Sequence, residues 1–190
     1  MGSDGLALVG RKAEKAGAFD PRLGEVYHAA LDADFRGFVD DLRDYASVAR
    51  RVSVAVNMED STWRLSQTIN RGSRAGRPDI AELSPNARRW LLEASTTHGL
   101  EIVKVRPANI PGLSERSHTF WYNDPWVSSD VLITFLFHLP PQAHGLEREK
   151  LDAGGQVWTF PPDYMERLPG AMADLRERAG VLERSEASVP

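Results

Sequence analysis

Apolar positions recur at helical spacing over the first part of the chain. Asp20 and Pro21 supply an N-cap residue followed by proline at the first helical position. From there on, apolar side chains follow one another three or four residues apart: Leu23, Tyr27, Leu31, Phe35, Phe38, Leu42, Tyr45 and Ala49. The pattern predicts a long amphipathic helix over residues 21–49, which we expect to bury Phe38 and its apolar neighbours against a sheet. A helix broken near Asp32 to Asp34 is the alternative.

Shorter signals follow in the middle of the chain. Valine alternates with polar residues over residues 51–58, which is the period-two pattern of a half-buried strand. Ser61 is expected to cap a short helix before the glycine-containing loop at 71–78. Ser84 and Pro85 begin the clearest helix of the sequence, and a strand over residues 100–106 follows it directly.

The second half of the chain is predicted to be rich in strands, which cover residues 117–122, 131–139 and 156–160. Residues 131–139 are almost continuously apolar and rich in β-branched and aromatic side chains, so we predict a central strand that is covered on both faces. A buried helix capped by Asp130 is the alternative. A last helix, with Leu168 on its apolar face, is expected after the proline pair at 161–162.

The order of these elements favours an α+β fold. Helices come mostly early and strands mostly late, which predicts a mostly antiparallel or mixed sheet of about five strands with about four helices packed on it. The 190 residues contain no repeat and no linker, so we expect a single domain over residues 20–183 between tails at 1–19 and 184–190. A domain of this size buries about 70% of its unfolded surface and needs no covalent cross-link.

Composition narrows the classes of function. The absence of cysteine excludes disulfides, thiolate metal sites and a cysteine nucleophile. The longest apolar run is about half as long as a membrane-spanning helix, and the first ten residues lack the apolar stretch of a secretory signal. We therefore expect a cytoplasmic protein that does not bind membranes. A net charge of −4 argues against a surface built entirely for polyanions.

The motifs that identify common enzyme classes are absent. The sequence has no phosphate-binding loop, no G-x-G-x-x-G, no H-E-x-x-H and no G-x-S-x-G, and it indicates no cofactor and no metal. One constellation suggests chemistry, because His118, Asp124, Asp130 and His138 flank two predicted strands. If these strands pair, an imidazole and a carboxylate meet at one end of the sheet, as a metal site or the acid and base of a hydrolytic enzyme require. The alternative is structural: Asp124 forms a turn, Asp130 caps a helix, and both histidines end strands.

Two other features suggest binding. Trp121, Tyr122 and Trp126 are aromatic residues of the kind that dominates protein interfaces, although they could equally fill a corner of the core. The glycine-containing loop carries guanidinium groups that can contact phosphates or an acidic partner, or simply remain solvated: Arg71, Arg74 and Arg77. No aromatic residue lies between these arginines for base stacking, so nucleic acid is the weaker expectation.

The sequence thus favours a non-catalytic interaction protein over an enzyme. We expect an accessory, regulatory or structural subunit of a larger assembly, with another protein or a second copy of the chain as its partner. The alternative is a small hydrolytic enzyme that uses the histidines and aspartates named above.

Overall fold

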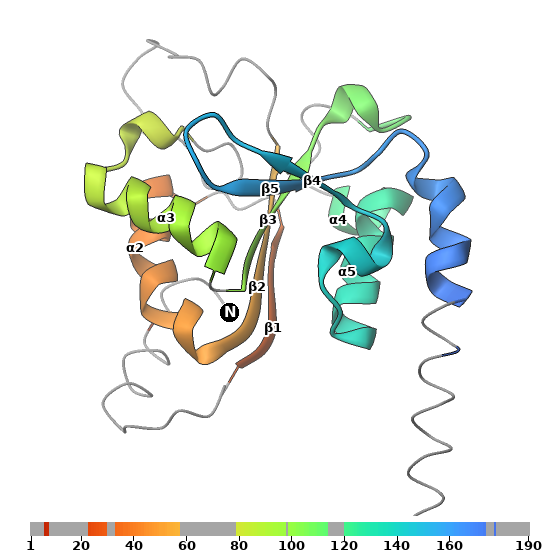
Figure 1. The fold of residues 1–190 in the computed structure, drawn as a ribbon, viewed down its shortest axis with the longest axis horizontal. Helices are drawn as coiled ribbons and strands as arrows, with labels where there is room; N and C mark the ends of the chain where they lie inside the picture. Colours follow the sequence, from red (N-terminus) through yellow and green to blue (C-terminus); the bar gives the residue numbers. More distant parts are fainter. Residues whose placement is uncertain are drawn as a thin grey trace, which may run out of the picture.

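A mixed sheet forms the middle layer of the fold (Figure 1). The computed structural model describes residues 6–7, 23–29, 33–57, 79–97, 99–113, 120–173 and 177. Within these residues, five strands lie in the order β1 (Leu23–Ala29), β2 (Ala49–Asn57), β3 (Leu100–Val105), β5 (Gln156–Thr159) and β4 (Glu147–Lys150). The first four strands in this order run parallel, and β4 is antiparallel to β5. The sheet is therefore mixed and the fold is α+β, as the sequence predicts.

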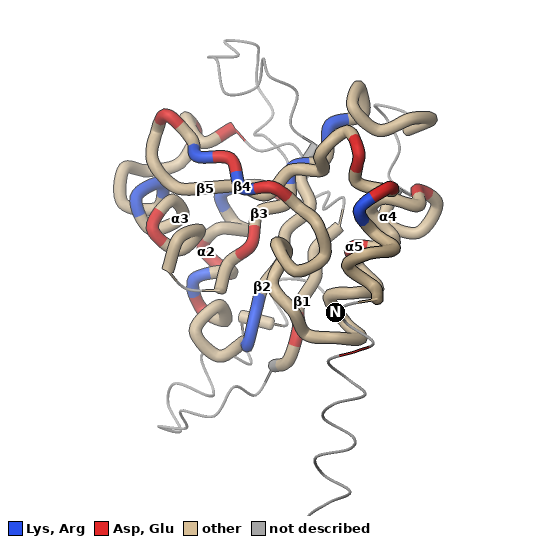
Figure 2. The backbone as a smooth tube through the Cα atoms, turned by 45° about the vertical axis from the view of Figure 1, so that its right-hand side comes forward, with Lys and Arg blue, Asp and Glu red and all other residues tan. Residues whose placement is uncertain are grey.

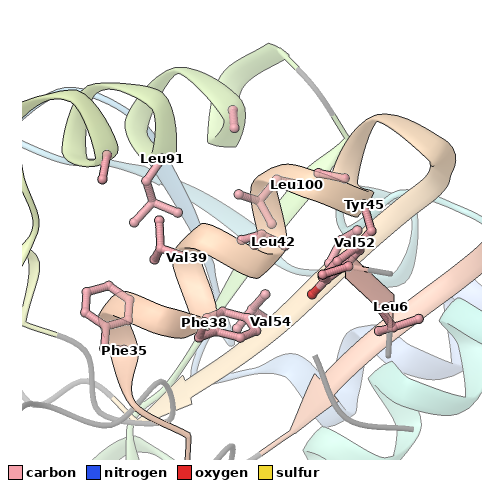
Figure 3. Close-up of a cluster of buried hydrophobic side chains, with 14 of the residues drawn as sticks. Leu6, Phe35, Phe38, Val39, Leu42, Tyr45, Val52, Val54, Leu91 and Leu100 are labelled. Carbon is pink, nitrogen blue, oxygen red and sulfur yellow. The ribbon is translucent and has the colours of Figure 1, made fainter. Parts of the chain in front are cut away.

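Helices α2 (Phe35–Tyr45) and α3 (Pro85–Thr97) cover one face of the sheet (Figure 1). The carboxylate of Asp34 accepts a hydrogen bond from the backbone N–H of Gly37 and so caps the start of α2. Both helices turn their apolar side chains toward β2 and β3, where they form a buried core (Figure 3). The core includes Phe35, Phe38, Val39, Leu42, Leu91, Val52, Val54 and Leu100. Burial of this apolar surface holds the two layers together.

The opposite face of the sheet is covered by α4 (Phe120–Asn123), by α5 (Pro125–Phe137) and by a helix over residues 164–173 (Figure 1). A second core lies between these helices and the sheet, and it includes Val103, Val105, Trp126, Val127, Phe160 and Tyr164. The short helix η4 (Pro141–His144) connects α5 to β4. The sheet is thus the middle of three layers.

The prediction of one long helix over residues 21–49 is wrong. Residues 23–29 form β1, α2 begins only at Phe35, and the short helix η1 (Ala46–Val48) leads directly into β2. Side chains of β1 alternate between the two faces: the His28 ring packs against Phe38 of α2, whereas the Tyr27 hydroxyl bonds to Asp130 of α5. Two covering layers therefore favour a strand here over the helix that the local spacing suggests.

The predicted strand over residues 131–139 is also wrong, because residues 131–137 belong to α5. Asp124 caps this helix by accepting hydrogen bonds from the backbone N–H groups of Trp126 and Val127, and Pro125 occupies its first turn. Of the predicted strand over residues 117–122, residues 120–122 belong to helix α4 and the remainder lies outside the described residues. A strong helix start thus overrides the β-branched composition.

The remaining predictions divide between confirmed elements and residues that the structure does not describe. The strands expected over residues 51–58, 100–106 and 156–160 are present as β2, β3 and β5, and the helix expected from Pro85 is α3. The expected last helix is present over residues 164–173. The helix expected after Ser61 and the arginine loop lie outside the described residues. Strand β4 consists of charged residues alone, so no apolar alternation predicts it.

Candidate functional site

One face of α5 carries large apolar side chains on the protein surface. Leu132, Phe135 and Leu136 are 58%, 44% and 68% exposed, and their spacing of three and four residues places them on one side of the helix. Asp130 is the only charged residue in α5, and it is buried. The backbone of α5 is therefore tan, the colour of uncharged residues, along most of its length in Figure 2. A helix that is apolar all round is normally covered all round. We call these three residues the α5 face.

The aromatic residues before α5 divide between the surface and the core. Trp121 and Tyr122 of α4 are exposed, with their rings in edge contact at a centroid distance of 4.8 Å. Trp126 is buried, and its ring lies 5.6 Å from that of Tyr164 and 6.2 Å from that of Phe160. Two of the three aromatic residues singled out for binding therefore reach solvent, and the third fills the core.

Charged groups fix the end of α5 to the sheet. The Arg51 guanidinium of β2 donates to the backbone carbonyls of Leu139 and His138, which lie just beyond the helix. Glu25 of β1 is buried, and its carboxylate lies 4.0 Å from Arg51 and 3.5 Å from Nδ1 of His138. A cation at a helix C-terminus interacts favourably with the helix dipole. These contacts hold α5 above β1 and β2.

A buried polar cluster fixes the middle of the same helix. The carboxylate of Asp130 accepts a hydrogen bond of 2.9 Å from the Tyr27 hydroxyl, and its other oxygen lies 2.8 Å from Nδ1 of His144 in η4. Burial raises the pKa of both Tyr27 and Tyr164 and is the largest cause in each case. The negative charge of Asp130 raises both pKa values further. Both phenols therefore remain protonated, and the Tyr27 hydroxyl donates to Asp130. The cluster joins β1, α5 and η4 in the interior.

The four residues proposed for chemistry do not share one described site. Asp124 binds backbone N–H groups as the N-cap of α5, so it acts as a helix cap where the sequence suggests a turn. Asp130 lies inside α5 with Tyr27 and His144, so the expectation that it caps a helix is wrong. His138 is the C-cap of α5 in a left-handed conformation and faces Glu25. His118 lies outside the described residues.

A small cavity lies at the carboxyl ends of β3 and β5. It has a volume of about 160 Å³, and polar side chains from both strands and the following loop line it, among them Lys104, Arg106, Asn109 and Thr159. The Lys104 ammonium is buried and lies 3.1 Å from the Glu149 carboxylate, which also lies 3.7 Å from Arg106. The cationic side chains at this edge are therefore balanced by an anionic one.

Three further points concern a metal site, a membrane-spanning helix and the arginine loop. Among the described residues, no group of three or more histidine or acidic side chains is arranged to hold a metal ion. No helix in that part of the chain has both the length and the apolar character needed to cross a bilayer. Arg71, Arg74 and Arg77 lie outside the described residues, so their contact with an anionic partner stays a prediction.

The sequence reasoning missed the α5 face and the cluster around Asp130. The spacing of Leu132, Phe135 and Leu136 is a helical signal, but the strand prediction for this stretch concealed it. Tyr27 precedes Asp130 by 103 residues, and no local pattern links them. Their contact exists only because α5 packs on β1.

Comparison with known proteins does not identify the chain: no family model, no curated protein and no solved structure matches it.

Proposed function

We propose that this chain is a non-catalytic interaction protein, an accessory, regulatory or structural subunit that binds another polypeptide through α4 and α5. The observation that carries the proposal is the exposure of five large apolar side chains on these two helices: Trp121, Tyr122, Leu132, Phe135 and Leu136. Apolar patches of this kind mark interaction surfaces in folded proteins. Tryptophan and tyrosine are also the residues that contribute most to binding energy at interfaces.

The energetics of the α5 face favour a partner. Burial of one leucine or phenylalanine side chain is worth about 1.5 to 3 kcal/mol relative to exposure. A partner that covers Leu132, Phe135 and Leu136 therefore gains several such contributions, and no charge on α5 has to be desolvated because Asp130 is already buried. The contact of His138 with Glu25, the bonds from Arg51 and the cluster around Asp130 hold the helix in place. A rigid binding helix loses little conformational entropy on association.

The experiment uses tagged full-length protein produced in its native cells. The double variant Leu132→Lys, Leu136→Lys places two ammonium groups on the α5 face, and the matched control Asn86→Lys, Thr96→Lys adds the same charge to exposed positions on α3. We expect wild type and control to retain the same stoichiometric partner, whether a different protein or an untagged copy of the chain, and the α5 variant to lose it. Equal retention by all three proteins would contradict the proposal.

A small hydrolytic enzyme is the second candidate, and the direction of the strands favours it. Strands β1, β2, β3 and β5 run parallel, and open sheets with parallel strands commonly bind ligands beyond their carboxyl ends. The cavity beside Arg106 lies at this edge. Asp124 and Asp130 are engaged elsewhere and His138 faces Glu25, so His118, which lies outside the described residues, is the residue to test.

Turnover of p-nitrophenyl esters tests this second candidate. An enzyme of this kind requires hydrolysis above the uncatalysed rate that falls by at least about 100-fold in His118→Ala, since general acid–base groups contribute about that factor or more. Glu93→Gln, an exposed change on α3, serves as the control and should keep the wild-type rate. Absence of turnover above the uncatalysed rate in the wild-type protein contradicts this second candidate.

A further inference from the structure

The free edge of the sheet lies next to the α5 face. Among the described strands, β1 pairs only with β2 and ends the sheet on that side. An edge strand of this length presents backbone N–H and C=O groups that can pair with another strand. The Tyr27 ring of β1 lies 6.5 Å from the ring of Phe135, so one residue of the α5 face lies beside the edge strand. The edge and the face therefore form one surface.

We propose that the occupant of this surface is a second copy of the chain, which pairs through β1 and packs α5 against α5 about a two-fold axis. This inference rests on the proposed function and names its partner. Two-fold dimers are the commonest oligomers, and each copy then contributes the same surface. Addition of a strand to a free sheet edge is a recurring mode of protein association.

The geometry brings both features together in a single arrangement. A two-fold axis perpendicular to the sheet places β1 antiparallel to β1 of the second copy, and the two sheets become continuous. The same axis keeps both α5 helices on one face of the extended sheet. Because Phe135 lies beside β1, pairing of the two edges draws the two α5 faces toward each other. One contact thus covers the backbone edge and the apolar side chains.

Charge also favours a second copy as the occupant. A self-complementary contact brings each group on the axis close to its own equivalent, so charged residues there would repel one another. Leu132, Phe135 and Leu136 are uncharged, and the one charged residue of α5 is buried. Figure 2 shows charged positions on α2, α3, β2 and β4 and also beside α4, whereas α5 itself is tan along most of its length. The α5 face is therefore suited to contact itself in a chain whose net charge is −4.

Sedimentation of the purified full-length chain tests the proposal. We expect a concentration-dependent species with twice the mass of one chain. Leu132→Lys, Leu136→Lys should raise the dimer dissociation constant by at least about tenfold for each leucine. The control Asn86→Lys, Thr96→Lys should leave it unchanged. A monomer at all concentrations, or a dimer that persists in the α5 variant, overturns the proposal.

Cross-linking tests whether the edge takes part, and the absence of native cysteine makes it specific. Single variants Gly24→Cys on β1, Leu132→Cys on α5 and Asn86→Cys on α3 are treated with a short bismaleimide. A cysteine side chain fits at Gly24, where an added Cβ meets no atom within 4 Å. We expect covalent dimers from Gly24→Cys and Leu132→Cys and none from Asn86→Cys. Cross-linking from Leu132→Cys alone overturns the pairing through β1.

The two proposals fail in different ways. A purified chain that stays monomeric, but that retains a different polypeptide in cells through Leu132 and Leu136, overturns the second copy and leaves the interaction function intact. Loss of both self-association and partner retention overturns the two proposals together.

Discussion

His28 is a buried imidazole whose protonation opposes folding. Its ring packs edge-on against Phe38 at a centroid distance of 5.2 Å, and its Nε2 atom lies 2.6 Å from the Tyr45 hydroxyl. Removal of water from the charged form lowers the pKa of His28 from 6.5 to about 4. We therefore predict that mild acid destabilises the protein through this residue.

The magnitude follows from the difference between the folded and unfolded states. The pKa of His28 is about 6.5 when unfolded and about 4 when folded, so the unfolded chain binds the proton more tightly. The stabilisation is complete above pH 6.5 and is lost as the pH falls toward 4. Since one pKa unit corresponds to about 1.4 kcal/mol, the full shift is worth roughly 3 kcal/mol, of which roughly 2 kcal/mol is lost at pH 5.

Urea unfolding at about pH 7.5, 6 and 5 measures this effect. The variant His28→Gln places a neutral amide near the position of Nε2, so the difference in unfolding free energy between wild type and variant should shrink by about 2 kcal/mol from pH 7.5 to 5. Asn86→Ala, an exposed change on α3, is the control: it should change the unfolding free energy little at each pH and keep the wild-type pH dependence. Parallel pH curves for wild type and His28→Gln would refute the reasoning.

Three further predictions concern stability in urea at neutral pH. Phe38→Ala should lower the unfolding free energy by about 3 to 5 kcal/mol, because the side chain is buried under α2, and an unchanged midpoint contradicts this. Asp130→Ala should cost about 1 to 3 kcal/mol because the buried Tyr27 hydroxyl loses its acceptor, whereas Asp163→Ala at an exposed ion pair should cost little; equal effects refute the assignment. Asp124→Ala should remove the N-cap of α5 and cost about 0.5 to 2 kcal/mol, so wild-type stability argues against the cap.

Strands β2, β3 and β5 and helix α3 could be predicted because their local signals agree with their surroundings. Valine alternation in β2 matches a strand, and Ser84 and Pro85 mark the start of α3 as they would in an isolated helix. In contrast, β1 has helically spaced apolar residues, and only the layers on both sides of it explain why it is extended. Those layers are formed by residues that follow β1 later in the chain, so the residues near β1 do not indicate them.

The candidate site was predictable only in part, because its parts are joined by tertiary contacts. Composition alone indicates that Trp121 and Tyr122 suit an interface, but it does not separate them from Trp126, which packs against Tyr164. The partner of Asp130 is His144, not one of the histidines expected beside a strand. The contact between Asp130 and His144 depends on how η4 folds back onto α5, and the spacing of residues along the sequence does not predict it.

The misassigned stretch at residues 131–139 also explains why α5 supports an interaction function. Its continuous apolar character predicts a strand covered on both faces. That character indicates burial on all sides, whether the stretch is a strand or a helix. The stretch is a helix, so the sheet covers only the side that carries Ile133 and Thr134, and Leu132 and Leu136 remain exposed. The apolar composition still favours cover on the second side. The described residues do not provide that cover, and a second copy of the chain would.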